Sequence, residues 1–469
     1  YVDESYNPQG DGGGLTFAVR VNVYGKTGDK KPVTGPVSDV VIKNLSSGST
    51  YDDGTDTFIT GEDPNNYIWY SGKLWRAVSV NNDANTTKLV TQWNISAITY
   101  SSGNTAFEGS YVEDWLNDTS VDGFLGNLRD YENFIVSDAK WNATLDTTSL
   151  GSIIRPSDND TIVTAAVGLL NMYEYQSSYH GTTCSNGYLN NNFTWWTLTL
   201  YSSSTVRYID SYGYAYDRGY YFGCGVRPSI NLKSSIHIVD GDGTIDNPYR
   251  LEGDNDTNLS ETLLNTRYSG EYVRFGTGEN NLYRIVSHEN GTGTKITSAK
   301  PLKNSGTFIT SAFGNSTTFS STNTVGSFLN NDYLNIENGY LTEEDIAMIE
   351  DSTTWYLGRV GSGVSYKLAK YTDTNMSSTT SSTADAKVGL LRMGELMAGQ
   401  FDRYGNNTTY WTLTSSSSSH LWYVRLGGYN EYYFMQYTNG IKPSMNLKEN
   451  VIITSGDGTK NNPFTLALQ

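Results

Sequence analysis

The chain has 469 residues, of which 37% are hydrophobic and 13% aromatic, and it contains 36 tyrosines. This length allows two or three domains with their own cores, and the apolar content excludes a disordered chain. The formal net charge of −17 disfavours binding to nucleic acid or to an anionic membrane, because both partners require a basic surface.

Residues 1–61 precede the repeated part of the chain and begin with a glycine-rich stretch. From Leu15 to Tyr24, apolar and polar side chains alternate, which predicts a long strand. We expect this strand either to pair with an edge strand of a neighbouring copy or to fold onto its own chain. No signal-peptide pattern or apolar segment of transmembrane length is present, so we expect a signal or anchor to have been removed before Tyr1 or to lie beyond Gln469.

The segment that follows predicts a β-meander. Its strands are expected at 67–70, 74–80 and 88–91, joined by short polar turns. Further along, Cys184 and Cys224 lie outside any CxxC pair. One disulfide between them, which would imply an extracellular setting, is favoured over two free thiols.

A long internal repeat organises the rest of the chain. The sequence WWTLT at 195–199 returns as YWTLT at 410–414, and GVRPSINLK at 225–233 returns as GIKPSMNLK at 440–448. Both copies close on a GDGT turn followed by Asn-Pro and an aromatic residue. We therefore divide the chain into an N-terminal extension with a possible assembly strand (1–61), module 1 (62–253), a linker (254–267) and module 2 (268–469).

Helix signals are clearest in module 2. Thr342 and Asp345 form a capping-box pattern, and a second helix capped by Thr383 or Asp385 is expected to run through Leu396. The linker predicts a polar connection with one helical turn. Strand sets around short helices indicate an α+β, β-rich fold.

The repeated terminal strands and the GDGTxxNPY turn resemble modules of bacterial surface proteins found in Firmicutes and their relatives. The resemblance covers both modules and implies two tandem C-type-lectin-like modules, distantly similar to formylglycine-generating enzymes and to phage receptor-binding proteins. Such modules often follow a pilin-like N-terminal helix. The cysteines of the catalytic members are not matched, because module 2 lacks counterparts of both Cys184 and Cys224. We therefore assign no catalytic residue and expect no enzyme activity.

No cofactor and no metal site are expected. The four histidines (His180, His237, His288 and His420) are scattered without the spacing of a metal site. The run from Asp240 to Asp246 superficially resembles a calcium loop, but its spacing is wrong for an EF-hand. A tight turn is favoured there, with calcium as the minor alternative.

Aromatic residues gather between the repeated strands of both modules. They are interpreted either as cross-strand ladders that stabilise a hairpin or as a face for a sugar, a peptide or a neighbouring subunit. The candidate binding residues are Tyr208, Tyr212, Tyr214, Tyr216 and Tyr220 in module 1, and Trp422, Tyr423, Tyr429, Tyr432 and Tyr433 in module 2.

These features lead to two hypotheses. The first is a non-enzymatic, extracellular structural or adhesive protein, a subunit of a pilus-like surface filament that assembles into a homopolymer or associates with the cell surface. The alternative is a lectin-like adhesin module that binds carbohydrate or a host protein.

Overall fold

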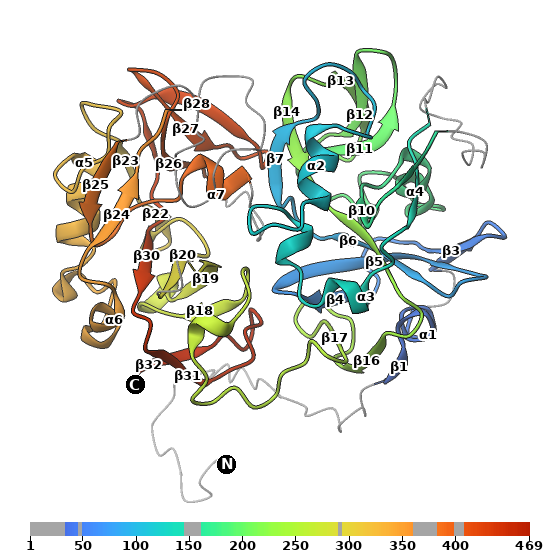
Figure 1. Cartoon of the computed structure of the whole chain (residues 1–469), viewed down its shortest axis with the longest axis horizontal. Coiled ribbons are helices and arrows are strands. Elements are labelled where there is room, and N and C mark those ends of the chain that lie inside the picture. Colours follow the sequence, from blue (N-terminus) through green and yellow to red (C-terminus); the bar gives the residue numbers. More distant parts are fainter. Residues whose placement is uncertain (1–32, 46–48, 145–160, 289–292, 360–381, 398–407) are drawn as a thin grey trace, which may run out of the picture. The chain divides into compact units, whose positions relative to one another are not determined.

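The computed structural model describes residues 33–45, 49–144, 161–288, 293–359, 382–397 and 408–469 (Figure 1). Val33 to Gln469 belong to one compact unit. The described residues form several sheets with short helices beside them, so the predicted β-rich α+β class is confirmed. The strand predicted at 15–24 lies outside the described residues. Among the described helices, none is both long and apolar enough to cross a membrane.

Module 1 is built on a ten-stranded sheet, counted over the described residues. Its main path follows the order β1 (Gly35–Pro36), β16 (His237–Asp240), β17 (Tyr249–Leu251), β4 (Tyr67–Tyr70), β5 (Lys73–Asn81), β6 (Thr87–Thr91), β15 (Ser229–Leu232) and β10 (Val167–Gly168). β2 (Thr50–Asp52) and β3 (Asp56–Ile59) join it beside β5. The meander predicted at 67–91 is therefore confirmed. The end of the predicted N-terminal extension also contributes strands to this sheet.

A second sheet of module 1 carries the repeated Trp-Thr-Leu-Thr strand. Its order is β13 (Ala215–Gly219), β12 (Thr205–Ile209), β11 (Trp195–Leu200), β14 (Gly223–Val226) and β7 (Ser96–Thr99). A separate hairpin joins β8 (Lys140–Asn142) to β9 (Ile162–Thr164). The helices of this part are α1 (Val37–Lys43), α2 (Tyr111–Asn117), η1 (Leu125–Asn127), α3 (Tyr131–Phe134) and α4 (Met172–Ser177).

Among the described residues, module 2 repeats the first sheet with four strands and the second sheet with the same number of strands, five. The first sheet has the order β18 (Tyr272–Arg274), β19 (Leu282–Ser287), β20 (Thr294–Ser298) and β30 (Ser444–Leu447). The second sheet has the order β23 (Thr310–Ala312), β29 (Thr438–Gly440), β26 (Tyr410–Ser415), β27 (His420–Val424) and β28 (Asn430–Phe434). Two-stranded pairs are β21 (Lys303–Asn304) with β22 (Thr307–Phe308), β24 (Thr353–Tyr356) with β25 (Thr383–Ala386), and β31 (Val451–Ser455) with β32 (Thr465–Leu468). The linker contains η2 (Leu264–Thr266). The helices of module 2 are η3 (Gly278–Asn280), α5 (Thr324–Ser327), the π-helical η5 (Phe328–Asp332), η6 (Ile336–Asn338), α6 (Glu343–Met348) and α7 (Met393–Met397).

The two modules share the same strand registers. Asn231 pairs with Lys88 in module 1, and Asn446 pairs with Lys295 at the same place in module 2. In each module the last part of the chain also returns to the first strand in a parallel pairing: β17 lies beside β4, and Phe464 forms a parallel bridge with Val273. A one-residue slip would move every side chain to the opposite face of the sheet and break the packing of both faces, so the repeated core pattern fixes these registers.

Strand β5 illustrates why the central strands are buried on both faces. Trp75 packs on one face against Phe124, with ring centroids 6.2 Å apart. Its neighbour Arg76 points to the other face, because side chains alternate along a strand. There the guanidinium lies 3.6 Å from the Tyr67 ring centroid and 4.8 Å from that of Tyr188. Arg76 is buried, and these contacts cover its charged group.

The predicted helices have mixed outcomes. The capping box of Thr342 and Asp345 is present at the start of α6, and the linker contains one 3₁₀ turn, η2. The helix predicted from Thr383 is wrong, because residues 383–386 form β25 and pair with β24. The Trp355 indole N–H also donates to the carbonyl of Ala386. The helix begins only at Met393, where Glu395 accepts a hydrogen bond from the Arg392 backbone N–H.

A network of charges surrounds the linker. Asp256 accepts hydrogen bonds from Arg129 at 2.7 Å and from Arg267 at 2.8 Å. The buried Asp254 accepts from the Ser71 backbone N–H at 3.0 Å and lies 3.3 Å from Arg129. Burial raises the pKa of Asp254 to about 6, although Arg129 and the Ser71 N–H oppose the shift.

Candidate functional site

The structure divides the candidate aromatic residues by exposure. Tyr212, Tyr214 and Tyr216 of module 1 are exposed, as are Tyr432 and Tyr433 of module 2. Tyr208, Tyr220 and Tyr429 are half-buried, whereas Trp422 and Tyr423 are buried. The exposed set also includes Tyr221, Phe222, Leu426, Phe434 and Tyr437. We call Tyr212, Tyr214, Tyr216, Tyr221 and Phe222 hairpin surface 1, and Leu426, Tyr432, Tyr433, Phe434 and Tyr437 hairpin surface 2.

Each hairpin surface continues inward as a ladder of rings. In module 1, Trp196, Tyr208 and Tyr216 follow one another across β11, β12 and β13, with centroid distances of 6.4 and 6.1 Å. In module 2 the buried Tyr423 contacts Trp411 at 6.3 Å and Tyr433 at 5.6 Å. The inner rings therefore stabilise the hairpin, and the outermost rings face solvent on edge strands β13 and β28.

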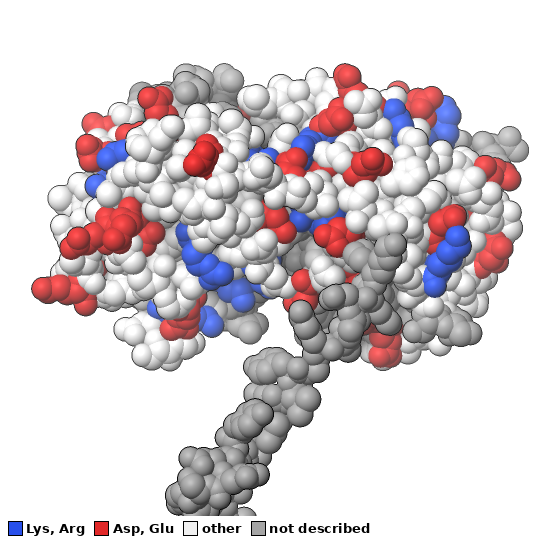
Figure 2. Space-filling model, turned by 90° about the horizontal axis from the view of Figure 1, so that it is seen from below, with Lys and Arg blue, Asp and Glu red and all other residues white. Residues whose placement is uncertain are grey.

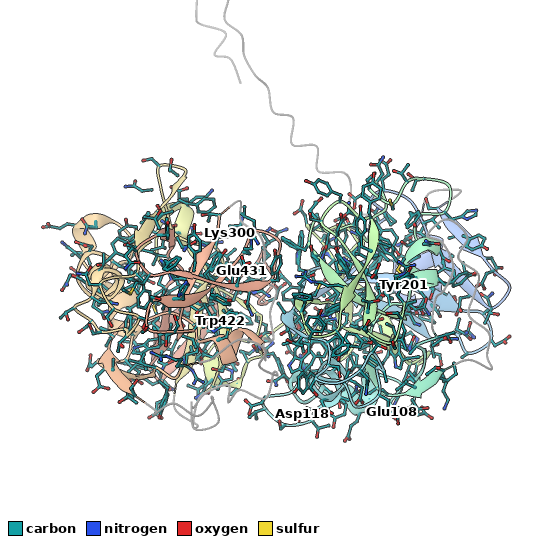
Figure 3. All side chains as sticks on the ribbon, turned by 90° about the horizontal axis from the view of Figure 1, so that it is seen from above. Glu108, Asp118, Tyr201, Lys300, Trp422 and Glu431 are labelled. Carbon is teal, nitrogen blue, oxygen red and sulfur yellow. The ribbon has the colours of Figure 1, made fainter. Side chains whose placement is uncertain are left out.

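The turn of the module 2 hairpin contacts module 1. The Thr194 backbone N–H donates to the Gly427 carbonyl at 3.3 Å, and the Asn430 amide donates to the Ala97 carbonyl at 3.4 Å. Trp422, labelled on β27 in Figure 3, belongs to the same hydrophobic cluster as the core of module 1. Glu431, on β28, accepts a hydrogen bond from the Tyr423 hydroxyl at 3.0 Å. Trp422 and Tyr423 are thus structural residues, and a ligand would reach Tyr432 and Tyr433 instead.

The predicted disulfide is not formed, since Cys184 and Cys224 are both free thiols. Cys224 lies on β14, where Gly225 pairs with Trp195, so its side chain shares the sheet face of Trp196. Cys184 lies near Tyr175, which packs on Trp195 and therefore on the opposite face. The sheet separates the two sulfur atoms. Burial raises the pKa of the Cys224 thiol to about 12, which makes it an inert core residue.

The run from Asp240 to Asp246 forms a tight turn. The Asp242 carboxylate accepts hydrogen bonds from the backbone N–H and the hydroxyl of Thr244, at 3.0 and 2.7 Å. Asp457 makes the same two contacts with Thr459, at 2.9 and 2.7 Å. The aspartate that both copies share therefore closes the turn on its own backbone.

Sequence reasoning missed a buried ion pair that occurs once in each module. Lys88 on β6 pairs with Glu174 on α4, and its ammonium nitrogen lies 4.8 Å from the Trp141 ring centroid. Lys295 pairs with Glu395 at 2.7 Å and lies 5.2 Å from the Trp355 ring centroid. We call these groups the Lys–Glu–Trp units. The aligned repeat carried the signal, because Lys, Glu and Trp recur at matching positions in both modules.

The module 2 unit is the more deeply buried of the two. Glu395 is inaccessible and Lys295 is 5% exposed, whereas the side chains of Lys88 and Glu174 are 14% and 12% exposed. Burial alone would raise the pKa of Glu395, but the charges of Lys295 and Arg392 outweigh it and hold that pKa below its usual value. The carboxylate therefore stays ionised.

The charged side chains of the chain are mainly acidic, with 49 Asp and Glu against 32 Lys and Arg. Figure 2 shows Asp and Glu side chains spread across one face, interspersed with fewer Lys and Arg side chains. No protein-family model matches the chain, and neither a curated protein nor a solved structure shows significant similarity to it.

Proposed function

We propose that this chain is a non-enzymatic extracellular structural and adhesive protein, a subunit of a bacterial surface filament whose copies contact one another through the two hairpin surfaces. The observation that carries this proposal is the exposure of aromatic rings on an edge strand in both modules. Tyr216 on β13 is 48% exposed, and Tyr432 on β28 is 45% exposed.

Two physical arguments support a contact role for these surfaces. Single exposed apolar residues are ordinary, but a group of neighbouring exposed rings is typical of an interaction site. In addition, among the described strands β13 and β28 lie at the ends of their sheets, where a strand from another chain can pair with the edge. A partner strand would gain backbone hydrogen bonds and ring contacts together.

The number of surfaces supports an open assembly. Each chain carries one hairpin surface in each module, and the two differ in their residues. A contact between surface 1 of one copy and surface 2 of the next leaves one surface free at each end. Repeated head-to-tail contacts of this kind produce filaments rather than closed dimers.

The test combines light scattering and electron microscopy of the purified chain over a range of concentrations. We expect concentration-dependent association, lost at least tenfold in Tyr216→Arg and in Tyr432→Arg. Ile336→Arg is the matched control, because Ile336 is 46% exposed in η6 and belongs to neither surface. A parent protein that stays monomeric at every concentration would overturn the proposal. If the two variants instead lose binding on a glycan array, the lectin-like alternative is favoured.

A further inference from the structure

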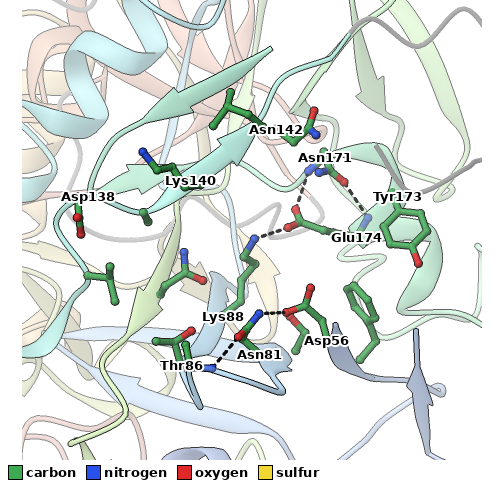
Figure 4. A pocket seen from close by; sticks show the side chains of 17 residues that line it. Asp56, Asn81, Thr86, Lys88, Asp138, Lys140, Asn142, Asn171, Tyr173 and Glu174 are labelled. Carbon is green, nitrogen blue, oxygen red and sulfur yellow. Dashed lines mark hydrogen bonds and ion pairs between the residues drawn. The ribbon is translucent and has the colours of Figure 1, made fainter. Parts of the chain in front are cut away.

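Module 1 contains a cavity of about 430 Å³ that is separate from the hairpin surfaces. Figure 4 shows it between β3, the ends of β5 and β6, the β8–β9 hairpin and α4. The Lys–Glu–Trp unit of module 1 lies at this place, since Lys88 and Glu174 both line the cavity. Pockets of this size are suited to small molecules.

The residues around the shared unit differ between the modules. Arg392 of module 2 stands at the position of Asn171, and Gly394 at that of Tyr173. Arg392 is buried, and its guanidinium lies 5.9 Å from the ring centroid of Tyr356, which replaces Asn142. Arg392 and Tyr356 are larger than Asn171 and Asn142, whereas Gly394 is smaller than Tyr173, so the place of the cavity is lined by different side chains in module 2.

One wall of the cavity comes from outside the repeat. Asp56 on β3 lines it and accepts a hydrogen bond from Asn81 at 3.1 Å. β3 belongs to the segment that precedes the repeated sequence, and it pairs with β5. Tyr173 lines the same wall and donates to Asp53 at 2.8 Å. The cavity is thus formed by module 1 together with residues that module 2 has no counterpart for.

Several polar groups in the lining are available to a ligand. Within the described part of the chain, the side chains of Asp138 and Asn231 have no hydrogen-bonding partner. Asn171 uses its amide oxygen to accept from the Glu174 backbone N–H at 2.9 Å, which leaves its NH₂ group as a donor toward the cavity. These groups offer both acceptors and donors.

The charges of the lining disfavour an anionic ligand. Asp56, Asp138 and Glu174 contribute carboxylates, whereas Lys88 and Lys140 contribute ammonium groups. Lys88 is already paired with Glu174, so an anion would meet an excess of negative charge. Hydroxyl groups both donate and accept, and they match amides and carboxylates without introducing a charge. Ile162 and Tyr173 supply an apolar wall for a C–H face.

We propose that this cavity of module 1 binds a neutral sugar residue, with Asp138, Asn171 and Asn231 bonding its hydroxyl groups and Tyr173 packing against its ring. The site does not depend on self-association, because neither hairpin surface contributes to its lining. It would give each subunit one carbohydrate contact in addition to its contacts with other copies. Module 2 would contribute none.

The test is saturation-transfer NMR and calorimetry of the full chain with glucose, galactose, mannose, fucose, N-acetylglucosamine and N-acetylgalactosamine. We expect at least one sugar to bind. Asn171→Arg, which places the module 2 residue in the cavity, should weaken this binding at least tenfold. Arg392→Asn makes the reverse exchange in module 2 and should leave the affinity within twofold of the parent. A thermal melt of each variant checks that it is folded.

A second pair of variants distinguishes a loss of sugar binding at the cavity from a loss caused by misfolding. Asp138→Ala removes an exposed carboxylate without a structural partner and should weaken sugar binding at least fivefold. Tyr216→Ala alters hairpin surface 1 and should not change it. For a contact with a single sugar we expect dissociation constants of ~mM. The proposal would be overturned if the parent protein bound none of these sugars at 20 mM. Unchanged binding by Asn171→Arg, or preference for inorganic phosphate or glycine, would overturn it as well.

Discussion

Lys295 and Glu395 form a 2.7 Å ion pair on the inside of module 2, and Lys88 and Glu174 form the corresponding pair in module 1. The pairs are equivalent in sequence but differ in exposure. Because water screens the module 1 pair more, the same substitution should have unequal effects in the two modules.

Substitution of Glu395→Gln should lower the free energy of unfolding by about 3–5 kcal/mol, because the Lys295 charge would remain buried without a partner. Glu174→Gln should cost less than half as much. The double variant Lys295→Met/Glu395→Gln should recover part of the loss, since both charges are then absent. Urea unfolding followed by tryptophan fluorescence measures these differences. Equal losses in the two modules would contradict the explanation by burial.

The pH dependence of stability should change when Asp254 is replaced by Asn. Burial raises the pKa of Asp254 from 3.8 to about 6, so between these pH values the folded chain holds a proton that the unfolded chain has lost. The stabilising contribution of this group is complete below pH 4 and falls as the pH rises to about 6. Asp254→Asn should therefore gain about 3 kcal/mol relative to the parent between pH 4 and pH 7.

Urea midpoints of Asp254→Asn and of the parent at pH 4, 5, 6 and 7 would measure this difference. Contributions of other carboxylates, including the salt-bridged Asp256, are common to both proteins and cancel. A difference that stays constant across the series would show that Asp254 titrates at its ordinary value.

Gly168→Ala should destabilise module 1 by about 1–3 kcal/mol, the usual cost of overpacking a core. A Cβ atom at Gly168 would lie 2.3 Å from the Trp141 ring, and one at Gly389 would lie 2.7 Å from the Trp355 ring. Gly103→Ala is the control, because a Cβ atom there has no neighbour within 4 Å. Differential scanning calorimetry of the two variants gives the comparison, and equal melting temperatures for Gly168→Ala and Gly103→Ala would refute the prediction.

The two cysteines should react at different rates in the folded protein. Cys184 is partly exposed and should be labelled by iodoacetamide within minutes, whereas Cys224 is buried and should be labelled only after unfolding. Mass spectrometry without a reducing agent should show two labels on the unfolded chain. A mass lower by two hydrogens, with no label, would instead show that Cys184 and Cys224 form the predicted disulfide.

Much of the fold was predictable because the repeat supplies two observations of each element. The strands at 67–91 follow from alternating side chains and short turns, and the capping box of Thr342 lies where the pattern places it. The prediction of a helix from Thr383 was wrong because it relied on a local capping signal, whereas residues 383–386 pair with another strand. Trp355 on the facing strand decided the outcome through its contact with Ala386.

The candidate sites were less accessible to sequence reasoning. Aromatic content located both hairpins, but only the strand order, which places β27 inside the sheet and β28 at its edge, separates the buried Tyr423 from the exposed Tyr433. The cavity of module 1 requires β3, which lies outside the repeat and pairs with β5 over a separation that no local pattern specifies. Whether two thiols share a sheet face likewise depends on the register of β11 and β14.

The parallel pairing between the first and last parts of each module has a mechanical consequence. Pulling the start of β4 away from the end of β17 loads all the hydrogen bonds between these strands at once, in shear. The corresponding parallel bridge between Val273 and Phe464 places module 2 under the same kind of load. Antiparallel neighbours would instead be peeled apart one bond at a time. A chain stretched between fixed ends would therefore resist extension at the entrance of each module before its interior is exposed.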